Sequence, residues 1–181
     1  MLSDREIKKY IGQGKIKISP FVASQLGPSH YKVRLGKTLL IPKAGQLIDL
    51  RLSEVEVPYK KIELTEMGYI LEPNQFLLGQ TLELVAMDKD ILIFIDGRSI
   101  LARLGISIHQ CSTTLLPGQE SHIITLEIFN AGKFRVKLYP NLKVGKIIFF
   151  QSKLKNSKGN SEYGGLYSGQ KETTGAKLKQ L

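Results

Sequence analysis

Short apolar runs with a two-residue repeat dominate the chain between about residues 15 and 150. In runs such as Lys15-Ile16-Lys17-Ile18, polar and apolar side chains alternate, and this alternation is typical of a half-buried β-strand. Turns that contain proline, glycine or asparagine separate the runs, and no helical repeat lies between them. The runs occupy residues 15–18, 31–35, 38–41, 76–84, 91–95, 123–129, 134–139 and 144–150. This pattern predicts an all-β sandwich or barrel.

Both ends of the chain depart from the strand pattern. Ser3 and Glu6 have the spacing of a capping box, which predicts a short helix that runs to about Ile11. The last segment is rich in Gly, Ser, Lys and Tyr without an apolar face, which predicts a flexible C-terminal arm. For 181 residues, 42% of them hydrophobic, we expect one β domain with its N-terminal helix over residues 1–155 and the arm over residues 156–181.

The net charge of +10 lies mainly at the two ends of the chain, while the centre is nearly balanced. Aromatic residues do not interleave with the lysines as they do in a groove that stacks bases, so we expect no nucleic-acid partner. No apolar run is long enough to span a membrane, and the N-terminus carries acids where a secretion signal is apolar. The single cysteine, Cys111, cannot form an internal disulfide. These features predict a cytoplasmic protein without a membrane partner.

Two arginines and a hydroxyl follow directly after the apolar run 91–95. In a helical turn, Ser99 and Arg103 are four residues apart and share a face, so their donors can converge on a phosphorylated ligand with help from Arg98. The alternative is the start of a helix whose arginines are solvated. The residues alone leave both interpretations open.

A glutamate lies inside the apolar run 123–129. Alternation places Glu127 on the same face as Thr125 and Phe129. It is either an ordinary outward-facing residue of a half-buried sheet or a desolvated acid suited to proton transfer. Zinc chemistry is not expected, because a zinc deaminase site needs two or three thiolates and the chain has one cysteine.

Several blocks of sequence carry a family resemblance. They include Leu2-Ser3-Asp4-Arg5-Glu6-Ile7, Gly97-Arg98-Ser99-Ile100-Leu101-Ala102-Arg103-Leu104-Gly105, Ile124-Thr125-Leu126-Glu127 and the closing stretch Tyr163 to Lys171. In order and spacing they resemble the dCTP deaminases, the deaminating branch of the dUTPase-like nucleotide hydrolases. The resemblance implies a distorted jelly-roll or β-barrel subunit of the dUTPase-like type, assembled into a homotrimer or hexamer with active sites at subunit boundaries. It also implies zinc-independent hydrolysis of dCTP to dUTP and ammonia.

The resemblance assigns roles to single residues as well. Glu127 would be the general acid/base, Ser99 would orient the attacking water, and Arg103 would hold Glu127 and phosphate oxygens. Arg98, Gln170 and Lys171 would grip the triphosphate together with Mg²⁺, and Tyr163 and Tyr167 would cover the nucleotide when the arm closes. The nucleotide-binding set is completed by Ile100, Leu101, Ala102, Thr125 and Leu126.

One turn departs from the family pattern. Where the family has an aspartate before the catalytic strand, this chain has Leu116 in Leu115-Leu116-Pro117-Gly118. The missing carboxylate counts against a dUTP diphosphatase or a bifunctional enzyme and should weaken recognition of the deoxyribose. Glu120 is a possible replacement carboxylate. Two alternatives therefore stay open beside the deaminase: a dUTP diphosphatase and a non-catalytic nucleotide-binding homologue.

Overall fold

The computed structural model describes residues 1–52, 56–152 and 165–178. The predicted boundary between domain and arm at residue 155 lies outside these residues. Along the chain the elements are α1 (Asp4–Gly12), β1 (Ile16–Ser19), the 3₁₀ turn η1 (Ala23–Gln25), β2 (Leu26–Gly27), β3 (His30–Arg34), β4 (Thr38–Pro42), β5 (Tyr59–Glu63), β6 (Tyr69–Leu71), β7 (Phe76–Met87), β8 (Ile91–Gly97), α2 (Ser99–Ala102), β9 (Ile106–Ser107), β10 (Thr114–Leu115), β11 (His122–Asn130), β12 (Val136–Leu138) and β13 (Lys143–Gln151).

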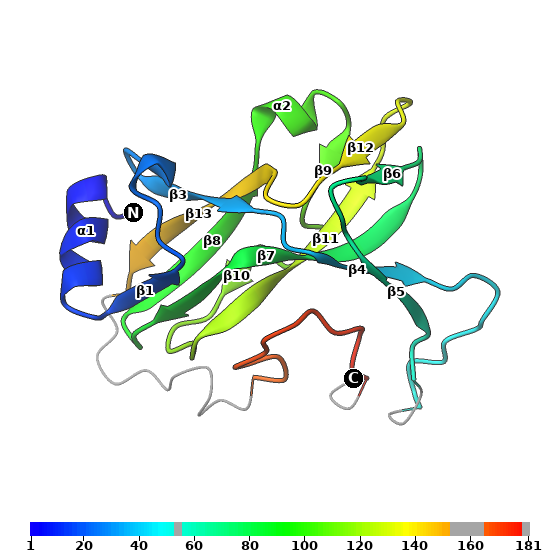
Figure 1. Cartoon of the computed structure of the whole chain (residues 1–181). Coiled ribbons are helices and arrows are strands. Elements are labelled where there is room, and N and C mark those ends of the chain that lie inside the picture. The colour runs from blue at the N-terminus through cyan, green and yellow to red at the C-terminus, as the bar shows by residue number, and fades with distance from the viewer. Residues whose placement is uncertain (53–55, 153–164, 179–181) are drawn as a thin grey trace.

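Two antiparallel sheets form the body of the protein. The first has the order β5-β4-β7-β11-β9, with β1 also paired to β7, and the second has the order β10-β8-β13-β3-β2. A small third sheet pairs β12 with β6. Strands β7 and β11 run through the middle of the molecule, with α1 at one end (Figure 1). The predicted all-β fold is confirmed.

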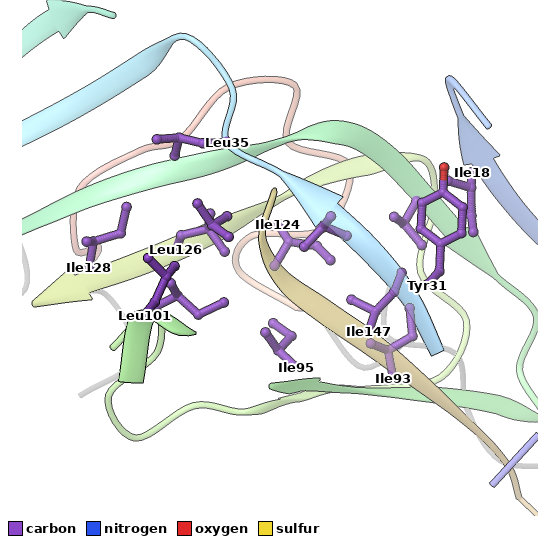
Figure 2. Close-up of a cluster of buried hydrophobic side chains, with 14 of the residues drawn as sticks. Ile18, Tyr31, Leu35, Ile93, Ile95, Leu101, Ile124, Leu126, Ile128 and Ile147 are labelled. Atoms are coloured by element: carbon purple, nitrogen blue, oxygen red, sulfur yellow. The ribbon is translucent and has the colours of Figure 1, made fainter. Parts of the chain in front are cut away.

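The core fills the space between the two main sheets. From β11 of the first sheet come Leu126 and Ile128, and from the second sheet come Tyr31, Ile93 and Ile147, all of them at most 1% exposed. These side chains converge between the strands (Figure 2). Their inward positions follow from the two-residue repeat of each strand, because alternate side chains point to the same face.

Helix α1 begins as the sequence predicts. The N–H of Ser3 donates to the Glu6 carboxylate over 2.7 Å, and the Ser3 hydroxyl accepts from the N–H of Glu6 over 3.4 Å. This reciprocal capping box satisfies two N–H groups that a helix N-terminus otherwise leaves unpaired. Of the helices in the described ranges, none combines the length and apolarity needed to cross a bilayer.

Strand β11 presents one face to the core and the other to the C-terminal arm. Leu126 and Ile128 are buried in the core, while Thr125 and Glu127 on the opposite face are half-buried. The register against β7 shifts between Ile123 and Thr125, so strict alternation fails at the start of the strand. The described part of the arm, residues 165–178, lies beneath β7 and β11 (Figure 1), and it covers this outward face.

Candidate active site

A cavity of about 560 Å³ lies between β11 and the arm. This volume falls in the range of roughly 300–1,000 Å³ typical of small-molecule sites. Strand β11 contributes Ile123, Thr125 and Glu127 to the walls, and the arm contributes residues 165–167 and Gln170. Among the described residues that line the cavity, Glu127 is the only carboxylate.

Hydrogen bonds to a neighbouring loop fix the position of Glu127. Its Oε2 accepts from the backbone N–H of Gln110 over 2.7 Å, and its own N–H donates to the carbonyl of Ile108 over 2.9 Å. Within the described residues, Oε1 has no hydrogen-bond partner. One carboxylate oxygen is therefore held, and the other is available to a substrate or a water.

Thr125, two residues before Glu127 on the same face, is tied to the arm. The Gln170 amide donates to the Thr125 hydroxyl over 3.0 Å and reaches the carbonyl of Ile123 over 3.3 Å. The N–H of Ile123 in turn donates to the carbonyl of Gln170 over 3.0 Å. These bonds place Gln170 at the cavity wall, and its role in nucleotide binding stays a prediction.

The other predicted arm residues have different surroundings. Tyr167 lines the cavity, with the Lys177 ammonium 5.1 Å from the centre of its ring. Lys171 donates to the carbonyl of Ser121 over 2.5 Å and is not part of the cavity wall. Tyr163 lies outside the described residues.

The arginine turn lies away from the cavity. Helix α2 lies at the top of Figure 1 and the arm at the bottom, with the sheets between them. Ser99 and Arg103 are exposed, and Arg98 donates through Nη1 to the carbonyl of Lys143 over 2.9 Å. No residue from 98 to 103 is among the described residues that line the cavity. One subunit therefore does not bring Ser99 and Arg103 to Glu127.

Two of the predicted nucleotide-binding residues belong to the hydrophobic core. Leu101 is 8% exposed and Leu126 is fully buried, and both side chains point into the core (Figure 2). Any contact of these two residues with a nucleotide must come from their backbone atoms. Their neighbours Ile100 and Ala102 on α2 are exposed instead.

The turn that lacks the family aspartate lies at the cavity. Leu116 lines it and is 46% exposed. Glu120 is exposed and does not line it. Its Oε2 lies 3.5 Å from the position that a Cβ on Gly169 would occupy, so this carboxylate faces the arm.

Sequence interpretation did not identify His122 as a site residue. It lines the cavity and is only 3% exposed. Its Nδ1 donates to the carbonyl of Glu120 over 2.7 Å, while Nε2 is buried without a hydrogen bond to any described residue. Burial lowers the pKa of His122, although the carbonyls of Glu120 and Val85 oppose this shift.

The chain matches a known protein family. The sequence pattern of the family described as dCTP deaminase-like matches residues 1–152. The chain belongs to the dCTP deaminase-like family. A "dCTP deaminase, dUMP-forming" of Sulfurihydrogenibium sp. strain YO3AOP1 is 34% identical over 179 residues, which cover 98% of this chain and 97% of that protein. A protein of the same name from Persephonella marina is 33% identical over 179 residues, which cover 98% of this chain and 97% of that protein.

A solved structure shares the fold of this dCTP deaminase-like chain. The 2'-deoxycytidine 5'-triphosphate deaminase from Agrobacterium tumefaciens superposes with a TM-score of 0.62 at 19% identity. The match covers 82% of this chain and 47% of that one, so the chain spans about half the length of that structure. At this identity the likeness concerns the fold alone.

The names of the relatives correct one expectation about the reaction. The sequence led us to expect dUTP as the product, and both relatives are named as forming dUMP. The prediction that the reaction ends at dUTP is therefore wrong. It gave too much weight to Leu116, because the loss of one carboxylate at one turn does not remove the other acids that a fold can bring to a triphosphate.

Proposed function

We propose that this chain is a dCTP deaminase that forms dUMP. Hydrolysis removes the 4-amino group of cytosine as ammonia, and a second hydrolysis between the α- and β-phosphates releases pyrophosphate. The names of relatives that cover 98% of the chain support this reaction. The observation that carries it is the placement of Glu127, the sole carboxylate among the described residues that line a nucleotide-sized cavity.

Glu127 is the general acid/base of the deamination. The N–H of Gln110 holds Oε2, so Oε1 accepts a proton from the water that attacks C4 of the cytosine ring. The same carboxyl group then delivers the proton to the amino nitrogen, which leaves as ammonia. General acid–base catalysis of this kind contributes about 10² to 10⁴ in rate.

Ser99 and Arg103 complete the site from a second copy of the chain, in a homotrimer. Support comes from the separation of α2 and the arm (Figure 1) and from Ile100, an apolar residue on α2 that is 59% exposed. The outer face of β8 and β13 is also apolar. Cross-strand pairs there join Phe94 to Ile148 and Leu92 to Phe150, and Phe94 is 37% exposed. An apolar face of this kind is suited to burial against a neighbouring subunit.

The substrate enters as a complex of Mg²⁺ with dCTP. The described residues contain no group of three histidine, cysteine, aspartate or glutamate side chains that would hold a resident metal. When Mg²⁺ accompanies the substrate, triphosphate oxygens and water would be its ligands, and its charge would offset theirs. Arg98, Gln170 and Lys171 bind the phosphates beside it.

The phosphate-cleaving step also needs a group that activates water. Glu127 is one candidate because it lies in the cavity wall, and Glu120 is the other because its carboxylate faces the arm at Gly169. Each residue is substituted separately, and the formation of dUMP from supplied dUTP is measured. The substitution that abolishes dUMP formation identifies the residue that activates water in this step.

A product assay tests the function. The protein is incubated with Mg²⁺ and dCTP, ammonia is measured by a coupled enzymatic assay, and nucleotides are separated by anion-exchange chromatography. We expect ammonia and dUMP in equal amounts without accumulation of dUTP, and loss of both products in Glu127→Gln. Accumulation of dUTP, or binding of dCTP without any product, contradicts the proposal.

A further inference from the structure

The arm is anchored by residues that follow its nucleotide-binding motif. Glu172 accepts a hydrogen bond from the Thr38 hydroxyl over 3.1 Å and forms an ion pair with Lys61 over 2.7 Å, both through Oε1. Thr38 and Lys61 lie on β4 and β5, so Glu172 ties the arm to the edge of the first sheet.

Thr173 makes the second attachment and is buried, with 4% exposure. Its N–H donates to Oε1 of Gln80 over 2.9 Å, and its Oγ1 lies 3.1 Å from Oγ1 of Thr125. Buried N–H and hydroxyl groups in native proteins are almost always hydrogen-bonded. Here the N–H of Thr173 is paired with Gln80 on β7, and its hydroxyl is paired with Thr125 on β11.

The surface around these bonds fits the arm closely. A Cβ on Gly175 would lie 2.5 Å from Cε2 of Tyr59, so the absence of a side chain lets the arm backbone approach the ring. Leu178 beyond it is 5% exposed. Buried positions therefore occur as far as the last described residue, between exposed residues such as Thr174 and Lys177.

The chain is long enough to reach this surface on its own subunit. The N–H of Ser152, the last described residue before the arm, donates to the carbonyl of Asp90. Three residues before Asp90 along the chain, the N–H of Met87 donates to the carbonyl of Gln119, which lines the cavity. The arm therefore starts near the cavity. The residues between Ser152 and Gly165 can span roughly 40 Å when extended. No second subunit is required to supply the arm.

We propose that Glu172 and Thr173 are positioning residues that latch the arm onto its own chain, so that Gln170 and Tyr167 serve the cavity of the subunit that supplies Glu127. The arginine turn then comes from a neighbouring copy, and the arm does not. This inference rests on the proposed function only for the identity of the ligand.

Disulfide trapping tests the latch without any need for turnover. Thr125→Cys and Thr173→Cys are combined in a Cys111→Ser background, since their Oγ atoms lie 3.1 Å apart. We expect a monomeric band on a non-reducing gel and a mass lower by two hydrogens after oxidation. Covalent dimers or trimers overturn the proposal, and so do two free thiols. Each single cysteine variant serves as the control for non-specific disulfides.

A second pair guards against misfolding of the buried variants. Lys61→Cys and Glu172→Cys replace residues whose side chains are 58% and 51% exposed, and a short bifunctional thiol reagent should join them within one chain. Links between chains overturn the proposal, as does a failure to link within one chain.

Kinetics then connect the latch to the site. Thr173→Val should raise KM for dCTP about two- to tenfold while kcat changes less, because it removes one side-chain hydrogen bond that seats the arm. Thr65→Val, at an exposed loop threonine that does not line the cavity, is the matched control. An unchanged KM in Thr173→Val overturns the positioning role. If internal disulfides form but neither ammonia nor dUMP appears, the proposed function fails and the latch stands.

Discussion

Glu127 and Gln110 are joined by a hydrogen bond in which the backbone N–H of Gln110 donates to Oε2 over 2.7 Å. The donor belongs to the backbone, so it can hold the carboxylate with any residue except proline at position 110. The amide of Gln110 adds a bond of 2.7 Å to the Ser107 hydroxyl, which stabilises the loop itself. The orientation of the proposed catalytic acid therefore depends on the path of residues 107–110.

Replacement of this acid should stop deamination without unfolding the protein. We expect Glu127→Gln to lower kcat for ammonia release by about 10² to 10⁴, because an amide cannot carry the proton between water and the leaving nitrogen. Binding of Mg²⁺-dCTP, measured by calorimetry, should persist. Glu120→Gln is the matched control, since Glu120 is exposed and outside the cavity wall, and it should release ammonia at the rate of the unaltered protein. Ammonia release by Glu127→Gln at that same rate would remove Glu127 from the chemistry.

Mixed oligomers should reveal whether the arginine turn is shared between subunits. Arg103→Ala and Glu127→Gln should each be inactive alone, and a mixture should recover part of the activity after subunit exchange. Recovery is expected because some sites then combine an intact Arg103 from one chain with an intact Glu127 from another. Native mass spectrometry of differently tagged chains verifies the exchange. Verified hybrids without activity would show that both residues must come from the same chain.

The buried His122 should make stability depend on pH. Its pKa is lowered in the folded protein mainly by burial, so the unfolded chain binds the proton more tightly, with a pKa of about 6.5. Its contribution to stability is therefore present above about pH 6.5 and is lost as the pH falls below that value. For one such group the slope approaches about 1.4 kcal/mol per pH unit.

Urea unfolding at a series of pH values between 7.5 and 5 measures this slope for the unaltered protein and for His122→Asn. The variant should show a shallower fall in the free energy of unfolding at acid pH. His30 retains a pKa lowered by partial burial, so some slope should persist in the variant. Identical slopes for the two proteins would rule out His122 as the source.

Sequence periodicity predicted eight of the strands but missed β2, β5, β6, β9 and β10. It also predicted the faces of β11 from Thr125 onward, because one sheet face meets the core and the other does not. It failed for His122, which begins a run of three buried residues. The arm covers the outward face at that point, and the register shift between Ile123 and Thr125 disturbs the alternation. Burial by a distant segment leaves no periodic signal in the strand itself.

The composition of the site was predictable in part. Alternation placed Thr125 and Glu127 on one face, and the structure adds Gln170 to them. The separation of Arg103 from Thr125, Glu127 and Gln170 was not predictable. The two-residue repeat of a strand indicates which sheet face a side chain lies on, but not which subunit supplies it. The anchoring of the arm through Glu172 and Thr173 was also missed, since pairs separated by more than 90 residues leave no local pattern.

The two faces of β11 should respond differently to loss of a side chain. Leu126 is fully buried in the core, and Leu126→Ala should lower the free energy of unfolding by about 2–5 kcal/mol through lost burial and the cavity left behind. Thr125→Ala removes the hydroxyl that contacts Gln170 and Thr173, and it should raise KM for dCTP about tenfold with a smaller effect on stability. Chemical denaturation and steady-state kinetics of both variants check this division, and a larger loss of stability in Thr125→Ala than in Leu126→Ala would contradict it. The contrast arises because the same strand contributes one face to the hydrophobic core and the other to the arm and the cavity.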